Sequence, residues 1–409
     1  MRGRVYVSVS EAGAPAGAGV VLEVVDLPRL ESPGRLKGRY VEVRNGGLLP
    51  AGGGAPGCRR ISSAEPDGNG DYLFEPECGG PRMDRPDIPE ERVRAYVQAA
   101  HFAEVNTYYH VDRIGQYIQG LLDELGAGSL PPVVAVVSAH NGCVNAGGVV
   151  DGVLRPGGWR PMQGGHYRLP GAAHDVAERE PVAATGEIHL GSGQRLLHAG
   201  ALARRAGRPY RQNAGHNAGI IYHEYGHHVH RHTADFRANN LRPSAEQSNR
   251  KVSIDEGLCD YWAAVMLDTP HIWAWHRGHD AGVHRRNLTS GKTMADYDDS
   301  DDADPHGNGT IWAACLWDFR TRLAGAEAGG ALDGARLADK IVLQALLLIG
   351  AIGRADRPAT CRERSSFRTL PLKLLEADRM LTGGRWRQTL AEVVDARGLG
   401  AGRRTEVRR

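Results

Sequence analysis

Five consecutive residues, His223–Glu224–Tyr225–Gly226–His227, constrain the fold of this chain more than any other feature. Two histidines four positions apart project from one face only if the segment is helical, because an α-helix has about 3.6 residues per turn. On such a face both imidazoles can bind one zinc ion, and Glu224 lies close enough to serve as a general base. The apolar Ile220 and Ile221 precede the motif, and no proline interrupts it. The segment therefore predicts a buried helix that carries a metal site. The alternative is a chance string, since the chain has 18 histidines.

A third metal ligand is expected downstream, because a catalytic zinc site uses three protein side chains and keeps one position open. Glu256 lies in a segment whose apolar residues, such as Leu258 and Trp262, recur with helical spacing. Asp260 follows Glu256 by one helical turn and shares its face. This pattern predicts Glu256 as the third ligand and Asp260 as a hydrogen-bond partner of a ligand histidine. The alternative for Asp260 is a solvated surface acid.

A further segment, Asp304–Phe319, contributes His306. An apolar helical pattern begins near Gly309, so His306 is expected just before a helix, rigidly held but accessible. A histidine in that place can stabilise the oxyanion of a tetrahedral intermediate. Taken alone, His306 would be an ordinary polar residue flanking a helix. The two segments before it favour the catalytic interpretation.

Composition and charge exclude several classes of protein. The chain has 409 residues, 41% hydrophobic and 24% charged, which is typical of a globular protein and not of a disordered one. Its 50 basic and 48 acidic residues leave a net charge of +2, so we expect no nucleic-acid partner. The longest apolar run, Ile341–Gly350, is interrupted by Gln344 and is too short to span a bilayer. We expect no membrane insertion, and the oligomeric state stays open.

The cysteines give no disulfide framework, because they are scattered and form no CxxC pair. Cys58 and Cys78 flank a loop-rich stretch and could pair. Cys259 and Cys315 lie in apolar helical patterns and are expected as buried thiols.

The residue composition and the hydrophobic periodicity change along the chain, and these changes predict three parts. Residues 1–88 carry short alternating runs between Gly- and Pro-rich turns, which favours a small β-rich region. Residues 89–233 form an upper catalytic lobe with a helix over 90–125, a buried strand in 131–139, a short strand in 186–193 and the HExxH helix. Residues 234–402 form a helical lobe. The predicted helices from residue 217 onward are 217–233, 252–268, 308–325, 337–351, 368–382 and 385–397.

Taken together, HEYGH, DEGLCDYWAA and PHGNGTIWAACLWDF resemble the thermolysin-type zinc metallopeptidases, and most closely their fungalysin branch. Weaker similarities follow in the same order, at Glu104–Leu121, Val144–Gly148, Gly186–Gly193 and Lys373–Gly400. The resemblance covers roughly residues 90–400. It implies an α+β, thermolysin-like fold of two lobes, with the zinc in the cleft between a small sheet-containing lobe and a mainly helical C-terminal lobe.

The resemblance also implies roles for individual residues of the metal centre. One zinc ion per chain would be bound by His223, His227 and Glu256. Glu224 would be the general base, and Asp260 would hydrogen-bond a ligand histidine.

Other implied roles concern the substrate. His306 would stabilise the oxyanion, and Asn145 and Ala146 would hold the main chain of the substrate. Family members also place an arginine against a substrate carbonyl. Arg285 and Arg286 are both available here, and Arg286 is preferred.

Three departures from the family pattern are visible. Nine positions before Glu256, where thermolysin has an oxyanion-binding tyrosine, this chain has Gln247. The stretch between VNAGG and GEIHLGSG is much longer than in thermolysin. The family is made with a signal peptide and a propeptide, and the start MRGRVYVSVS shows neither. Secretion is expected from the resemblance alone.

The predicted function is a zinc-dependent endopeptidase that acts on protein or peptide substrates. One alternative is a catalytically inactive zinc-binding or interaction protein on the same fold. Another is a zinc hydrolase of a different amide or ester, because a fold does not fix a substrate. The acidic run Asp296–Asp304 could bind Ca²⁺, as could the alternating acids of Pro66–Pro76, although solvated polar loops explain both.

Overall fold

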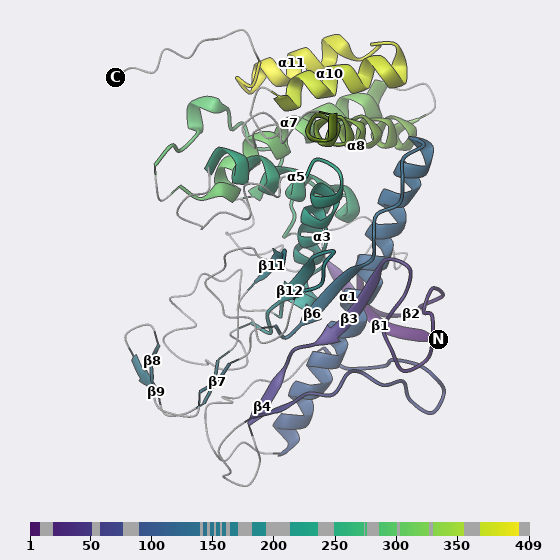
Figure 1. Ribbon diagram of the computed structural model, residues 1–409, viewed down its shortest axis with the longest axis vertical. Coiled ribbons are helices and arrows are strands. Elements are labelled where there is room, and N and C mark those ends of the chain that lie inside the picture. The colour runs from purple at the N-terminus through teal and green to yellow at the C-terminus, as the bar shows by residue number, and fades with distance from the viewer. Residues whose placement is uncertain are drawn as a thin grey trace.

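A computed structural model of the chain places a small sheet beside a long helix, with the remaining helices gathered beyond it (Figure 1). The described residues are 1–8, 19–50, 58–76, 90–139, 142–144, 148–150, 153–155, 158–160, 164–170, 182–193, 213–235, 249–273, 275, 286–300, 303–326, 330–355 and 369–400. The α+β fold class predicted from the sequence is confirmed, with a small β-rich N-terminal part and a mainly helical C-terminal part.

The main sheet has four strands in the order β11-β12-β6-β3, with bounds Gly165–Arg168, Glu187–Leu190, Val133–Val137 and Val41–Asn45. The strands β3, β6 and β12 are parallel, and β11 runs antiparallel to β12 at the edge of this set. The central strand β6 is a continuous apolar run, as expected for a strand covered on both faces. β3 comes from the N-terminal part of the chain and extends this same sheet.

The other strands form two-stranded ladders. β1 (Arg2–Ser8) pairs with β2 (Val20–Asp26) as an antiparallel hairpin. The shorter ladders join β4 (Leu48–Pro50) to β5 (Cys58–Arg60), β7 (Gly142–Val144) to β10 (Gly158–Arg160), and β8 (Gly148–Val150) to β9 (Val153–Arg155).

The long helix α1 (Glu90–Glu124) runs along the sheet and buries one apolar stripe, which includes Phe102, Val105, Ile114, Ile118 and Leu121. It also buries polar side chains that form hydrogen bonds to other elements. Asn106 accepts from the Tyr6 N–H and donates to the carbonyl of Gly215, in the 3₁₀ turn η3 (Ala214–His216). The helix α3 (Ala218–His232) follows directly, capped by Asn217, whose side chain accepts from the Ile220 N–H.

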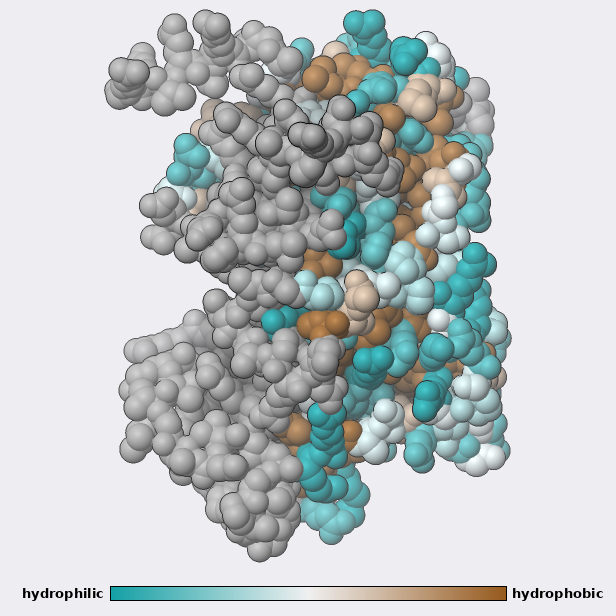
Figure 2. Space-filling view, viewed as in Figure 1, coloured by the Kyte–Doolittle hydropathy of each residue, from teal (hydrophilic) through white to brown (hydrophobic). Residues whose placement is uncertain are grey.

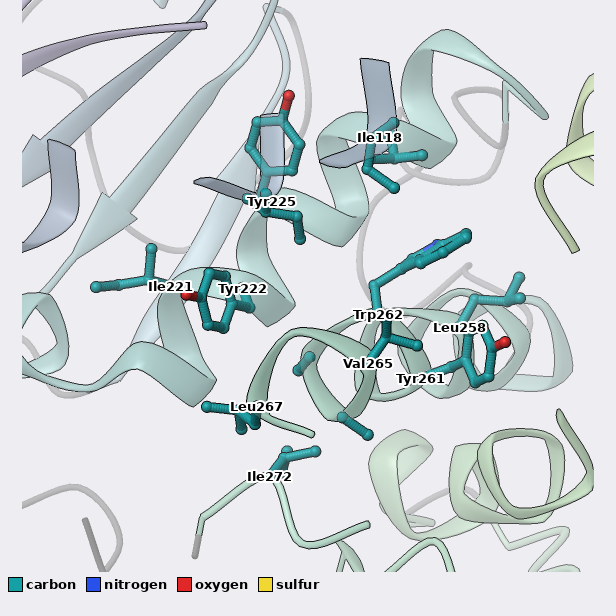
Figure 3. Packing of buried hydrophobic residues seen from close by; sticks show 14 of the residues in the cluster. Ile118, Ile221, Tyr222, Tyr225, Leu258, Tyr261, Trp262, Val265, Leu267 and Ile272 are labelled. Carbon is teal, nitrogen blue, oxygen red and sulfur yellow. The ribbon is translucent and has the colours of Figure 1, made fainter. Parts of the chain in front are cut away.

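The C-terminal part contains α5 (Asn249–Leu267), η6 (Met294–Asp296), α7 (Pro305–Ala326), α8 (Ala331–Ala355), α10 (Thr369–Thr382) and α11 (Arg387–Ala396). The core between α3, α5 and α1 is apolar and includes Ile221, Tyr225, Leu258 and Trp262 (Figure 3). Cys259 and Cys315 are buried free thiols, as predicted. The side chains of Cys58 and Cys78 lie outside the described residues.

Three predicted helices begin three or more residues earlier than expected. α5 begins at Asn249 and not at 252. α7 begins at Pro305 and not near Gly309, so His306 lies in the first turn of the helix and not ahead of it. The reason is the Asp304–Pro305 pair, since the Asp304 carboxylate accepts from the His306 N–H and proline suits a first helical position. α8 begins at Ala331, six residues before the predicted start at 337.

Polar residues cover much of the described surface on one face of the molecule, with apolar patches between them (Figure 2). Among the helices of the described residues, none combines the length and the apolar character needed to cross a bilayer.

Candidate metal centre

The helix α3 presents His223 and His227 on one face, with their ring centroids 5.2 Å apart. Gly226, which directly precedes His227, lets α3 lie directly on α5, because a Cβ atom there would be 2.9 Å from the Cα of Cys259. The start of α3 is fixed from the other side, where the hydroxyl of Tyr222 is 2.7 Å from Nδ1 of His110 on α1. Packing on both sides therefore sets the positions of the two imidazoles.

Glu256 of α5 faces these histidines. Its carboxylate oxygens are 2.9 Å from Nε2 of His223 and 3.7 Å from Nε2 of His227. One ligand atom from each of the three residues lies within 4.8 Å of the others, which is the compactness that a single ion requires. The structure thus brings together the three residues that the sequence predicts as metal ligands.

The hydrogen bonds behind the histidines show that this donor set suits a cation. Nδ1 of His223 is 2.9 Å from Oδ1 of Asp260, and Nδ1 of His227 is 2.9 Å from Oδ2 of Asp255. A carboxylate can only accept, so each Nδ1 can donate to its aspartate and leave Nε2 turned toward Glu256. Nη2 of Arg286 also lies 2.9 Å from Nδ1 of His223. Two imidazoles and a carboxylate that converge in a buried site are a donor set that fits zinc.

Asp260 is fully buried and is held by Arg286 as well as by His223. Nε of Arg286 donates to Oδ2 of Asp260 over 2.9 Å, and its Nη2 bonds Oδ1. The guanidinium also lies over the ring of Trp273, 5.1 Å from its centroid. Asp260 is therefore a buried partner of a histidine and not a solvated surface acid. Arg286, expected against the substrate, lies at this site with its charge neutralised by Asp260.

His306 reaches the centre from the first turn of α7. Its Nε2 is 3.1 Å from Oε2 of Glu256, and its Nδ1 is 3.0 Å from Oδ1 of Asp304. Asp304 therefore fixes the ring through one nitrogen, so that the other points toward Glu256. About a third of the His306 side chain is exposed, which leaves it accessible to a bound molecule.

Glu224 is buried beside the histidines, and the edge strand β11 passes close to it. A Cβ atom on Gly165 would lie 2.9 Å from both Cγ and Oε1 of Glu224, so only a glycine leaves room for the carboxylate. Oε2 of Glu224 has no hydrogen-bond partner among the described residues. The carboxylate is therefore placed in the site without being neutralised by a cationic side chain.

The pKa values of the two glutamates are shifted in opposite directions. Burial raises the pKa of Glu224 by more than the neighbouring His223 and His227 lower it. Burial would also raise the pKa of Glu256, but the imidazoles of His306, His227 and His223 together hold it well below its ordinary value. Glu256 is therefore suited to stay ionised as a ligand, whereas Glu224 is suited to accept a proton.

Several predicted residues lie outside the described ones, namely Asn145, Ala146, Arg285 and Gln247. The sheet edge next to β12 is occupied by β11, from Gly165 to Arg168. Sequence reasoning gave this strand no role. Its only signal is a short Gly-His-Tyr-Arg stretch inside a Gly-rich insertion, which has little strand character.

Asp255 is the main functional residue that the sequence analysis missed. It precedes Glu256, is buried, and bonds both His227 and His230 of α3. The sequence did contain a signal for Asp255, because an acidic residue on the buried side of an apolar helix needs a hydrogen-bond or ion-pair partner. Which histidine it would meet depends on how α3 crosses α5, which the sequence does not state.

An HExxH helix, a glutamate ligand on a second helix and a histidine at the start of a third are the arrangement of a glutamate-ligand metallopeptidase. Comparison of the sequence with known protein families indicates which branch of these peptidases it resembles. Residues 205–403 match the model of the fungalysin metallopeptidase (M36) family. This match covers slightly less than half of the chain and confirms the resemblance to the fungalysin type that was drawn from its motifs.

The chain is also similar to Extracellular metalloproteinase 4 of Arthroderma gypseum. The two are 29% identical over 211 residues, which cover 45% of this chain and 30% of the relative. The matched part of the chain thus spans about a third of the relative's length. The similarity supports the class of protein and leaves the activity of the whole protein to be proposed.

Proposed function

We propose that the chain is a zinc-dependent endopeptidase, with one zinc ion held by His223, His227 and Glu256. The observation that carries the proposal is the convergence of the two Nε2 atoms on the Glu256 carboxylate, with each Nδ1 bonded to a buried aspartate. A zinc ion held there would polarise a substrate carbonyl and lower the pKa of a water molecule toward neutrality.

Glu224 is the general base in this proposal. Its raised proton affinity lets it take a proton from the attacking water and later deliver it to the leaving amine. The alternative of an inactive zinc-binding protein gives Glu224 no task, and no observation favours it. His306 is the oxyanion donor. Asp304 accepts from Nδ1 and orients the ring. Burial lowers the pKa of His306, but the Glu256 and Asp304 carboxylates raise it to about 9, so the ring is protonated and Nε2 can donate where negative charge develops in the transition state.

The substrate would lie along β11. Among the described strands β11 is at the edge of the sheet, and its first residue touches Glu224. An extended peptide can add to such an edge as a further strand through main-chain hydrogen bonds. This would carry a peptide bond past Glu224. The role first expected for Asn145 and Ala146 would then be shared with, or taken by, Gly165–Arg168. Arg286 would act on the site mainly through Asp260.

Protein or peptide substrates and secretion are the expectations that fit this proposal, since the matched relative is named an extracellular metalloproteinase. Calcium is left out of the proposal. The described acids Asp296 and Asp298 accept from the N–H groups of Thr293 and Ser300, as acids of a polar loop do.

The test combines metal analysis with an activity assay on the purified full chain. We expect about one zinc per chain, hydrolysis of casein or of an internally quenched peptide, loss of hydrolysis with 1,10-phenanthroline, and recovery on adding zinc. Folded protein that binds no added zinc would overturn the proposal. Protein that binds zinc but cleaves no peptide would favour the inactive alternative.

A further inference from the structure

Behind the candidate metal centre lies a second group of buried polar side chains, and the roles proposed above leave two of them, His230 and Cys259, without a task. It consists of His227 and His230 on α3 and of Asp255 and Cys259 on α5. Oδ2 of Asp255 is 2.9 Å from Nδ1 of His227, and Oδ1 is 2.6 Å from Nδ1 of His230. The Sγ atom of Cys259 is 3.7 Å from Nδ1 of His230.

We propose that Asp255 is a positioning residue that holds His227 for metal binding, and that His230 holds Asp255 in place. The inference rests on the proposed zinc site. Because a carboxylate only accepts, Asp255 keeps the proton of His227 on Nδ1 and leaves Nε2 unprotonated toward Glu256. The second bond, from His230, engages the other oxygen of Asp255. With both oxygens bonded, the carboxylate cannot rotate away from His227.

The two ligand histidines are thus supported in different ways. Asp260 holds His223 and is itself bonded by the cationic Arg286. Asp255 holds His227 and is bonded by an imidazole. The two supports therefore differ in the group that holds the aspartate, a guanidinium for Asp260 and an imidazole for Asp255.

The same four side chains could be imagined as a second metal site, and their hydrogen bonds argue against it. Both oxygens of Asp255 accept hydrogen bonds from imidazole nitrogens, over 2.9 Å from His227 and 2.6 Å from His230. Oε2 of Glu256, at the candidate metal centre, instead has no hydrogen-bond partner among the described residues. The geometry at Asp255 is that of a carboxylate shared by two N–H donors.

The experiment measures zinc affinity without relying on activity. Metal-free protein is titrated with zinc against a chromogenic chelator, and the Co²⁺-substituted protein is examined by visible absorption. Asp255→Asn should weaken zinc binding by about 10- to 100-fold and change the Co²⁺ spectrum. His230→Leu should weaken it by severalfold. His230→Asn should stay near wild type, because its amide N–H can replace Nδ1–H. Cys259→Ala is the matched control from the same group and should also bind like wild type.

Each result has a defined meaning. Wild-type zinc affinity in both Asp255→Asn and His230→Leu would overturn the inference while leaving the proposed zinc site intact. If Asp255→Asn does not fold, equal affinities in His230→Leu and His230→Asn would overturn the role of His230. A second zinc equivalent in wild type that Cys259→Ala loses would replace the inference with a second metal site. Wild-type protein that binds no zinc would instead defeat the proposed function itself.

Discussion

Gly257 of α5 and Gly309 of α7 cross with their backbones in direct contact. A Cβ atom on Gly309 would lie 2.7 Å from the carbonyl oxygen of Ser253 and 2.8 Å from the nitrogen of Gly257, and one on Gly257 would overlap the carbonyl of Gly309. Glu256 is adjacent to Gly257, and His306 lies one turn before Gly309. The close crossing is therefore what brings Nε2 of His306 to within 3.1 Å of Glu256.

Substituting either of these glycines should separate the two helices. We expect Gly257→Ala to lower the free energy of unfolding by about 2 kcal/mol or more, because the obstacle is backbone and cannot rotate aside. Zinc affinity should fall as well, since Glu256 moves with α5. Denaturant unfolding and a zinc titration would measure both effects.

Gly325 provides the control for this prediction. It lies in the same helix as Gly309, and a Cβ atom there would meet nothing within 4 Å. Gly325→Ala should leave zinc affinity unchanged and stabilise the protein by up to about 1 kcal/mol, because alanine is the better helix former. If Gly257→Ala behaved like Gly325→Ala, the contact between α5 and α7 would not hold the site together.

Glu224→Gln tests the proposed general base. The amide has nearly the same shape but cannot take a proton, so zinc content should stay the same while kcat falls by about a hundredfold or more. Glu104→Gln is a suitable control, because Glu104 is also a buried glutamate but lies on α1, away from the metal centre. Near-normal turnover in Glu224→Gln would show that another group takes the proton.

The sequence was sufficient to predict the elements that carry the ligands. The spacing of His223 and His227, and that of Glu256 and Asp260, fixed α3 and α5 and the faces that meet, because helical periodicity is local information. The run over 131–139 likewise predicted β6. The segment Asp304–Phe319 predicted His306 from its place before an apolar helix, and the Asp304 cap extends α7 back to Pro305, so that His306 lies in its first turn.

What the sequence could not supply depends on contacts between distant segments. The placement of β11 beside Glu224 needs a glycine that touches an α3 side chain, and no local pattern predicts that contact. The sharing of Asp255 by His227 and His230 depends on the angle at which α3 crosses α5. Both features follow from tertiary packing, which periodicity alone does not determine.

The buried Glu104 should make stability depend on pH. Burial raises its pKa to about 8, although the Ala64 N–H and the Asn45 amide both donate to its carboxyl. The folded protein therefore keeps a proton that the unfolded chain releases near pH 4.5. The stabilisation that this proton provides is fully present below pH 4.5 and is lost as pH rises toward 8, by roughly 3–5 kcal/mol.

Glu104→Gln isolates that contribution. The amide cannot ionise, and it loses a good hydrogen-bond acceptor, so the variant should have a lower free energy of unfolding than wild type at pH 5. This deficit should shrink steadily as the pH rises to 8, because only wild type loses stability over that range. Guanidinium unfolding of both proteins at each pH gives the difference directly. A difference that does not vary with pH would mean that Glu104 titrates near its ordinary value.

His306→Ala tests the proposed oxyanion donor. The expected result is a kcat lowered by about a hundredfold or more with zinc content unchanged, because an interaction made only in the transition state is lost. The ratio kcat/KM should fall with kcat. Asp304→Asn should give a smaller loss, since the amide holds the His306 ring less firmly than the carboxylate does. Lys292→Met controls for loosening of this turn, because Lys292 donates to the Gly307 carbonyl without touching His306. A rise in KM alone would place His306 in substrate binding, and wild-type kinetics would assign the oxyanion to another group.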